Sequence, residues 1–187
     1  SVCVKSTVKP GSIDIWKERF GKILNISFVP EFLRERCATF DFIHNNNVLV
    51  IGTDDDKTEN LVRECHGVLP THTVVMKPIE AELMKYFSNS YKAMRVTFAN
   101  AFYRLCNEVD ANYDVVKDAF LFHGVGDGHY LRVNKKFGGF GGTCLPKDTK
   151  GLANLVDELG LDIEIFRTIV EDNERFTSDE QEERYEI

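Results

Sequence analysis

The chain has 187 residues, of which 43% are hydrophobic and 28% are charged, and this composition is typical of a soluble globular protein with one domain or two small ones. The formal net charge of -7 and the lack of any basic run argue against a general affinity for nucleic acid or for an anionic membrane, because phosphate binding depends on clustered Lys and Arg. No apolar stretch approaches the ~20 residues that a membrane-spanning helix needs, and no signal peptide opens the chain, so we expect a cytoplasmic protein.

Short apolar runs alternate with helix-like stretches from residue 1 to about residue 77. The runs are VCVKSTV, ISFV, VLVIGT and TVVMK, and the helix-like stretches are Ile13 to Ile23 and Lys57 to Cys65. This order, with runs rich in Val and Ile, predicts a parallel sheet covered by helices. Because the first run is already under way at Ser1, we expect the chain to be a piece of a longer protein.

A long amphipathic helix is predicted after Pro78, from Ile79 to about Asn107. The stretch contains neither Gly nor another Pro, and its apolar residues recur at steps of three and four. The stripe that they form consists of Leu83, Phe87, Tyr91, Met94, Phe98, Phe102 and Leu105. Further helices are predicted over 112–122, over 148–159 and from about 162, with a glycine-rich loop over 124–142. The acidic end of the chain predicts a solvated tail, with an acidic docking tail as the alternative.

The five cysteines and five histidines do not indicate a metal site. The cysteines are Cys3, Cys37, Cys65, Cys106 and Cys144, which are odd in number, widely spaced and without a CxxC pair. They predict reduced thiols rather than a disulfide framework. The histidines lack metal-ligand spacing. The segment GVGDG at 124–128 does not fit the GxGxxG fingerprint and is predicted to be loop.

The segment GGFGGTCLPKDT, residues 138–149, makes Cys144 the first candidate functional residue. Its glycines would let the backbone approach a ligand closely. CLPKDT resembles the start of a helix, with Asp148 or Thr149 able to cap it. A thiol just before a helix N-terminus, with Lys147 close by, is expected to be partly thiolate near neutral pH, as a nucleophile requires. The alternative is a small apolar residue in a tight turn.

Two residues one turn apart on the predicted long helix, Lys85 and Asn89, share a face roughly opposite the Leu83 and Phe87 stripe. An ammonium and an amide aimed at one spot could hold a developing oxyanion. The alternative is a solvated face. The same side also carries Ala93, Val96, Asn100 and Tyr103, so we expect it to be only partly exposed.

Two more segments are candidates on weaker grounds. Glu31 and Glu35 in VPEFLRE are four residues apart and suit acid–base chemistry if one is desolvated, although surface carboxylates are the alternative. STVKPG at 6–11 ends a predicted strand with Ser, Thr and a turn, where open parallel sheets bind their ligands.

Four segments occur in an order and at separations that resemble the UDP-glucose/GDP-mannose dehydrogenase family. They are KSTVKPGS, PEFLRERCATFDF, AELMKYFSNSYKAMRVTFANAFYRLC and GGFGGTCLPKDT, and the resemblance covers most of residues 3 to 175. It implies an α/β fold in which residues 1–77 are the C-terminal half of a Rossmann-like, NAD-binding parallel sheet. Residues 78–187 would be an all-helical central domain that carries the catalytic cysteine loop and forms a homodimer through helix 79–107.

Members of this family oxidise the C6 alcohol of a nucleotide sugar, such as a UDP-sugar, to a carboxylate with two NAD molecules. The resemblance implies that Cys144 captures the aldehyde as a thiohemiacetal, which becomes a thioester that water hydrolyses. It implies that Lys85 and Asn89 stabilise the oxyanion and that Thr7 and Asp148 position and activate water. Glu35 would join the proton-transfer network. Substrate contacts are implied for Glu31, Phe32, Leu33, Lys85, Asn89, Phe140 and Gly141, and NAD contacts for Ser6, Thr7, Glu35, Cys144 and Lys147.

The chain departs from the family pattern in several places. Neither the GxGxxG half of the NAD domain nor the C-terminal UDP-binding domain is present in the 187 residues, so we expect a truncation at both ends. Val29 stands where the family has Asn, Arg36 where it has Gly, and GVGDGHYLRV replaces the family's D-x-R-I-G loop. The arginine that a neighbouring subunit would lend is therefore not at its matching position, and we do not transfer that role to Arg132.

These departures keep two alternative functions open. The first is a truncated, inactive relative that serves as a dimeric scaffold or interaction module. The second is a relative of the β-hydroxyacid dehydrogenases, which also set a Lys and an Asn four residues apart on a helix but lack the GFGG-x-C block.

Overall fold

The computed structural model describes residues 1–34, 37–124, 126–134 and 138–177. Their elements in chain order are β1 (Val2–Val4), α1 (Ser12–Phe20), β2 (Ile26–Phe28), α2 (Ala38–His44), β3 (Val48–Gly52), α3 (Asp56–His66), β4 (His72–Met76), α4 (Pro78–Glu108), α5 (Tyr113–Phe122), α6 (Cys144–Glu158) and α7 (Ile165–Phe176).

The chain divides into two compact units, Ser1–Phe87 and Ser88–Ile187, and the division falls inside α4. The boundary expected between residues 77 and 78 coincides with the start of α4, and as a boundary between domains it stays a prediction. Among the described residues, no helix combines the length and the apolar character needed to cross a bilayer.

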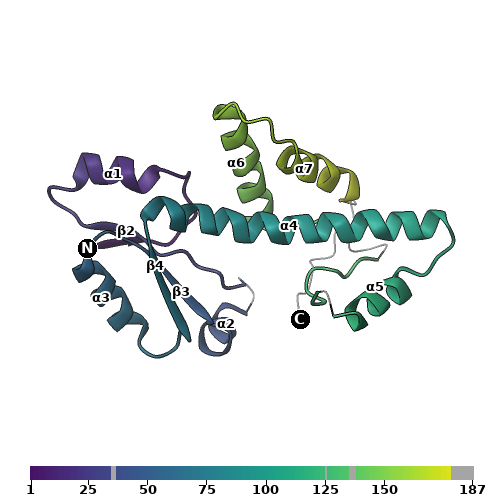
Figure 1. Cartoon of the computed structure of the whole chain (residues 1–187), viewed down its shortest axis with the longest axis horizontal. Coiled ribbons are helices and arrows are strands. Elements are labelled where there is room, and N and C mark those ends of the chain that lie inside the picture. The colour runs from purple at the N-terminus through teal and green to yellow at the C-terminus, as the bar shows by residue number, and fades with distance from the viewer. Residues whose placement is uncertain (35–36, 125, 135–137, 178–187) are drawn as a thin grey trace. The chain divides into compact units, whose positions relative to one another are not determined.

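The first unit is built on a four-stranded sheet in the order β1-β2-β3-β4 (Figure 1). β1 pairs with β2 and β3 pairs with β4 in parallel, which confirms the predicted α/β fold with a parallel-dominated sheet. The pairing of β2 with β3, through Phe28 and Gly52, is antiparallel and differs from the fully parallel sheet that we expected. A Cβ at Gly52 would lie 3.1 Å from the carbonyl oxygen of Phe28, so a glycine suits this contact.

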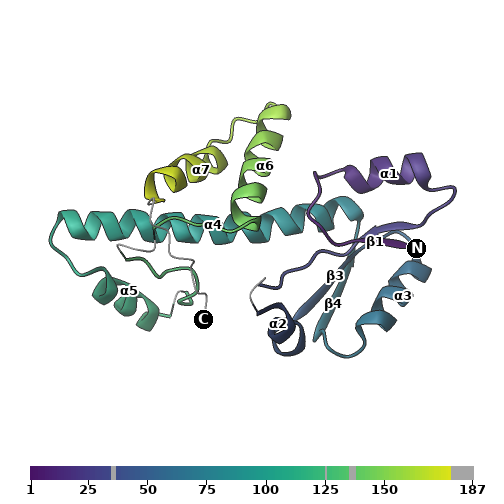
Figure 2. The same ribbon diagram turned by 180° about the vertical axis from the view of Figure 1, so that it is seen from behind.

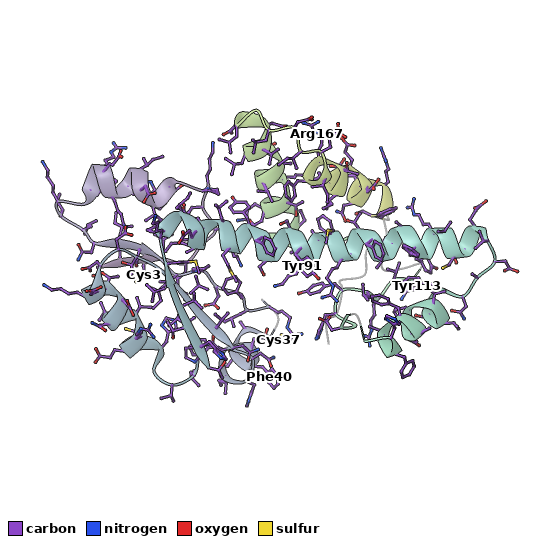
Figure 3. All side chains as sticks on the ribbon, in the orientation of Figure 1. Cys3, Cys37, Phe40, Tyr91, Tyr113 and Arg167 are labelled. Carbon is purple, nitrogen blue, oxygen red and sulfur yellow. The ribbon has the colours of Figure 1, made fainter. Side chains whose placement is uncertain are left out.

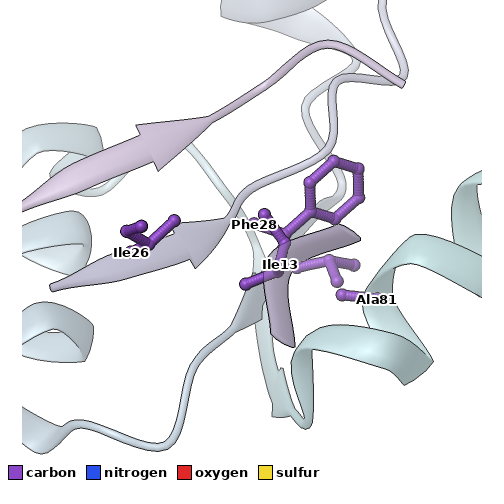
Figure 4. Packing of buried hydrophobic residues seen from close by; sticks show 5 residues of the cluster. Ile13, Ile26, Phe28 and Ala81 are labelled. Atoms are coloured by element: carbon purple, nitrogen blue, oxygen red, sulfur yellow. The ribbon is translucent and has the colours of Figure 1, made fainter. Parts of the chain in front are cut away.

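Helices cover both faces of this sheet. Buried side chains of the strands point to both faces, and each face forms its own hydrophobic core with the helices that cover it. Ile13 of α1 and Ala81 of α4 pack on one face, against Ile26 and Phe28 of β2 (Figure 4). On the other face, Val62 of α3 packs with two residues of β3 and with the residue that follows β2. These are Leu49, Ile51 and Val29. The side chains of β3 point alternately to the two faces, as a half-buried strand requires.

The second unit is assembled around the rest of α4, with α5 on one side and α6 and α7 on the other (Figures 1 and 2). Tyr113 of α5 is buried beneath α4 (Figure 3), donates a 2.7 Å hydrogen bond to the carbonyl of Leu131 and meets Tyr103 edge-on. On the α7 side, Ala93 and Val96 of α4 form a core with Phe140 and Ile169. The predicted long helix and the predicted helix over 112–122 are both present.

The buried side of α4 is the one that carries Lys85 and Asn89, not the stripe of large apolar residues. Small or polar residues, such as Ala93 and Asn100, are the ones covered. Phe87 is 74% exposed and Phe98 is 58% exposed. The periodicity therefore predicted the position of the apolar stripe correctly. The other elements of the chain nevertheless pack on the opposite side of α4, where small residues allow them to approach the helix closely.

Candidate functional site

Cys144 is the first residue of α6, and its side chain is exposed and unbridged. We expected it just before the helix, capped by Asp148 or Thr149, and that expectation is wrong. Thr143 is the N-cap residue and makes no side-chain capping bond, while Asp148 and Thr149 are buried within the helix. Cys144 nevertheless lies in the first turn of α6, where the backbone N–H groups have no partner within the helix.

Asp148 lies one helical turn after Cys144 and is tied to α4. The side-chain amide of Asn89 donates a 2.6 Å hydrogen bond to Oδ2 of Asp148. The two side chains are only 3% and 1% exposed. Nζ of Lys147 lies 2.9 Å from the other carboxylate oxygen of Asp148. The second unit therefore brings together four of the predicted site residues, because residues i and i+4 of a helix share a side.

Lys85 of α4 lies on the buried side of that helix, 9% exposed, and holds the segment around Glu31 within the first unit. Its ammonium donates to the backbone carbonyl of Glu31 and lies 5.3 Å from the centre of the Phe32 ring. The carboxylate of Glu31 is partly exposed and forms an ion pair with Lys5 at 3.2 Å. Glu31 is therefore not the desolvated carboxylate that acid–base work would need, and its backbone is the part that Lys85 contacts.

Asp41 of α2 binds Arg34, which lies at the other end of the segment that begins at Glu31. Its carboxylate accepts from Nε and a terminal nitrogen of Arg34, at 2.9 and 2.8 Å, and from the Arg34 backbone N–H at 3.0 Å. The side-chain amide of Asn45 donates to the same carboxylate at 2.8 Å. The Arg34 guanidinium holds the pKa of Asp41 well below its usual range. Phe32 and Leu33, both half-buried, thus lie in a segment fixed at both ends.

Glu82 of α4 holds the start of α1, which follows the segment that contains Ser6 and Thr7. It is 1% exposed, and its two oxygens accept from the backbone N–H groups of Gly11 and Ile13 at 2.6 and 2.9 Å. Burial raises the pKa of this carboxyl, although the two N–H groups act in the opposite direction. The carboxylate accepts hydrogen bonds from backbone N–H groups at the start of α1 that have no partner within the helix. This end of a helix favours negative charge.

The remaining predicted residues have simpler surroundings. Thr7 is half-buried, Ser6 and Gly141 are exposed, and Phe140 is buried. Glu35 and Arg36 lie outside the described residues. An open pocket of about 290 Å³ in the first unit, lined by residues such as Lys17, Asn25 and Asp55, contains none of the predicted site residues.

Asp41 and Glu82 were missed by the sequence reasoning. Asp41 lies in the quoted PEFLRERCATFDF segment and Glu82 in the quoted AELMKYF segment. Neither residue has a position in the sequence pattern that distinguishes it from an ordinary surface carboxylate. Their partners are backbone N–H groups and an arginine side chain, and a sequence pattern does not reveal which backbone groups a side chain will reach.

An α/β unit followed by a long helix, with a buried amide–carboxylate pair one turn from a helix-opening cysteine, agrees with the resemblance found in the sequence. Residues 79–175 match the central domain of the UDP-glucose/GDP-mannose dehydrogenase family. The chain belongs to this family, as predicted.

The similar proteins include UDP-glucose 6-dehydrogenases. The one from Rickettsia typhi is 35% identical over 182 residues, which cover 92% of this chain and 40% of the relative. UDP-glucose 6-dehydrogenase YwqF from Bacillus subtilis is 31% identical over the same shares. The solved structure of a UDP-glucose dehydrogenase from Pyrobaculum islandicum superposes with a TM-score of 0.82 at 33% identity, covering 93% of this chain and 41% of that chain. The chain thus spans about 40% of the length of the curated relatives it matches.

Proposed function

We propose that the chain carries the catalytic part of an NAD-dependent nucleotide-sugar 6-dehydrogenase, which oxidises a UDP-sugar of the UDP-glucose type to the uronate. The observation that carries this proposal is the buried pair of Asn89 and Asp148, one turn after the exposed cysteine that opens α6. The UDP-glucose 6-dehydrogenases that match 92% of the chain support it.

In the proposed reaction Cys144 is the nucleophile. NAD supplies the hydride acceptor for both oxidations. Loss of a hydride from C6 and of the C6 hydroxyl proton first turns the alcohol into an aldehyde. The Cys144 sulfur then adds to this aldehyde and forms a C–S bond, which gives a thiohemiacetal. Loss of a hydride from C6 and of the hydroxyl proton turns the thiohemiacetal into a thioester. Water then breaks the C–S bond, so that the carboxylate is released and the thiol returns to its starting state.

The neighbouring residues have proposed roles that follow from their chemistry. Lys85 and Asn89 would stabilise the oxyanion, because an ammonium and an amide N–H both donate to developing negative charge. Asp148 and Thr7 would position and activate the water that hydrolyses the thioester. The 2.6 Å bond from Asn89 supports a fixed orientation of the Asp148 carboxylate. Substrate contacts are proposed for Glu31, Phe32, Leu33, Lys85, Asn89, Phe140 and Gly141.

NAD contacts are proposed for Ser6, Thr7, Glu35, Cys144 and Lys147. The segment with Ser6 and Thr7 follows the carboxyl end of β1, where open α/β sheets bind nucleotides. The buried carboxylate of Glu82 holds the start of α1, where this segment ends, through the backbone N–H groups of Gly11 and Ile13. The hydroxyl groups of Ser6 and Thr7 suit a nucleotide cofactor, although the GxGxxG segment that would bind its pyrophosphate is not among the 187 residues.

The test is NADH formation from UDP-glucose and NAD, with the chain alone and with the chain joined to the flanking parts of the Rickettsia typhi relative. We expect weak or no turnover from the chain alone, because the pyrophosphate contacts are missing, and measurable turnover from the joined protein. Cys144→Ala should lower the restored activity by more than ~100-fold. Cys65→Ala, which changes another exposed free cysteine, is the matched control and should have little effect. Unchanged activity in Cys144→Ala would remove Cys144 from the mechanism.

A second proposed function is that of a dimeric scaffold. The observation that favours it is the exposed stripe on α4, where Phe87, Phe98 and Phe102 are 74%, 58% and 39% exposed. Exposed apolar stripes of this kind mark interfaces. We propose a homodimer through helix 79–107 in either case, and the scaffold would be the whole function if the joined protein proved inactive.

We also propose a cytoplasmic location. The five cysteines, which all lie among the described residues, form no disulfide, and the proposed nucleophile needs a reduced thiol. Such thiols persist in a reducing compartment.

A further inference from the structure

The turn that leads into Cys144 is shaped by contact with the end of α7. Gly139 has a φ of 68°, a conformation that residues with a side chain rarely adopt. A Cβ on this residue would lie 2.7 Å from Oγ1 of Thr177 and 2.8 Å from Oδ1 of Asn173. A Cβ on Gly138 would meet the carbonyl oxygen of Phe176 at 2.2 Å. The glycines are therefore needed because α7 lies directly against the turn, independently of any ligand.

Asn173 of α7 is matched to the backbone of Phe140. Its Oδ1 accepts from the Phe140 N–H at 2.5 Å, and its Nδ2 donates to the Phe140 carbonyl at 3.0 Å. One side chain thus satisfies both backbone groups of one residue, as a neighbouring β-strand would. Thr177 donates from its hydroxyl to the Asn173 carbonyl at 2.8 Å, which ties the end of α7 to the same place.

Asn100 of α4 holds Gly139, the residue before Phe140. Its Oδ1 accepts from the Gly139 N–H at 3.1 Å, while its Nδ2 donates to the Val96 carbonyl at 2.8 Å. The Phe140 side chain is 3% exposed and packs in the core with Val96 and Ile169. Four residues further along, the chain starts α6 at Cys144. The backbone of the turn is therefore anchored on two helices immediately before the cysteine.

We infer that Asn173 is a positioning residue: it fixes the peptide groups of Phe140 and thereby sets where the chain enters α6 and presents the Cys144 sulfur. Asn173 acts through Phe140 and touches neither the sulfur nor the reacting atoms. The catalytic meaning of this placement rests on the proposed function, but the placement itself does not. Asn173 lies in the acidic stretch that the sequence reasoning assigned to a helix end and tail.

The test compares Asn173→Leu, which keeps the size of the side chain but loses both hydrogen bonds, with Glu174→Gln. Glu174 is the next residue of α7, is exposed and pairs with Lys150 at the surface. Hydrogen exchange is measured at the amides of Gly139 and Phe140. Cys144 alkylation by iodoacetamide is followed in parallel by peptide mass spectrometry. Both measurements use the 187-residue chain and need no turnover.

In Asn173→Leu we expect the Phe140 amide to exchange ~10-fold faster, which corresponds to the loss of one partly buried hydrogen bond. We expect the alkylation rate of Cys144 to change several-fold, because a turn that is no longer held at Phe140 moves the start of α6 and with it the sulfur. The side chain is already exposed, so such a change reports a different position of the sulfur and not its uncovering. Glu174→Gln should change neither rate.

Three results would overturn the inference. Unchanged exchange at Phe140 would show that Asn173 does not hold the turn. Faster exchange with unchanged alkylation of Cys144 would show that the turn does not position the sulfur. Faster exchange throughout α5 and α6 would show general destabilisation instead. An inactive joined protein, made of the wild-type chain and the flanking parts of the relative, would count against the proposed function and leave both of these rates, and the inference, intact.

Discussion

The side-chain amide of Asn89 and the carboxylate of Asp148 are joined by a 2.6 Å hydrogen bond between α4 and α6, and both side chains are almost completely buried. A buried carboxylate is costly unless its oxygens have donors, so this bond links the stability of the second unit to the orientation of a proposed catalytic group. Loss of the bond should therefore lower the free energy of unfolding, which can be measured without an assay of activity.

Asn89→Leu should lower the free energy of unfolding by about 3 kcal/mol. The substitution keeps the size of the side chain but leaves the buried Asp148 carboxylate without the donor. Urea denaturation measures the change. The matched control is Asn154→Leu, at an exposed position of α6, which should stay within about 0.5 kcal/mol of the wild type. Equal stabilities of the two variants would mean that the bond contributes nothing.

Glu82 should make the stability of the chain depend on pH. Burial raises the pKa of its carboxyl, so the folded state favours the protonated form relative to the unfolded state. The contribution is fully present below the pKa of an unfolded glutamate, about 4.3. It is lost as the pH rises through the raised value. Glu82→Gln has no titrating group at this position. We therefore expect the wild-type advantage over Glu82→Gln in the free energy of unfolding to shrink as the pH rises from about 4 through the raised pKa of Glu82. Denaturant titrations across this range measure it, and a difference that is independent of pH would contradict the prediction.

Gly139→Ala and Gly142→Ala should differ in severity although both glycines have a positive φ. The φ of Gly142 is 76°, and nothing lies within 4 Å of a Cβ placed there, so its substitution should cost only ~1–2 kcal/mol of conformational strain. At Gly139 the added methyl group would also collide with Asn173 and Thr177. Thermal unfolding should show a clearly lower midpoint for Gly139→Ala, and equal midpoints would mean that α7 yields easily to the methyl group.

Phe98→Glu should weaken the proposed homodimer. Phe98 is 58% exposed on the α4 stripe and its ring lies 4.7 Å from that of Phe102, so a charge there would be desolvated in an apolar interface. Sedimentation at micromolar concentration should show a dimer for the wild type and a monomer for Phe98→Glu. Phe122→Glu, which changes a 92% exposed phenylalanine of α5, is the control and should remain dimeric. A monomeric wild type would count against both the dimer and the scaffold function.

Local patterns in the sequence predicted the elements that depend on neighbouring residues. The three-and-four spacing and the absence of glycine predicted a helix from Ile79 to about Asn107, and α4 runs from Pro78 to Glu108. The start of α6 was placed four residues too late, at Asp148, because a proline near the N-terminus and two possible caps fit several registers. The quoted segments likewise indicated the family, which residues 79–175 confirm.

The burial of α4 shows where such patterns end. Its large aromatic residues predicted one apolar side, yet the covered side carries Ala93, Asn100 and Asn89. The spacing of residues along a helix does not specify which of its sides will be covered. That depends on the elements that pack against the helix. Small residues permit close packing without producing a strong apolar signal.

By itself the sequence determined the α/β class, the long helix, the family and a cysteine next to a glycine turn, since these follow from periodicity and from motifs read along the chain. Only the tertiary structure decided that Asn89 meets Asp148, that Glu82 holds the start of α1 and that Asn173 holds the turn at Phe140. The physical reason is that each of these bonds joins groups 33 to 69 residues apart in the chain, and a hydrogen bond depends on distance and direction in space, which no spacing along the sequence encodes.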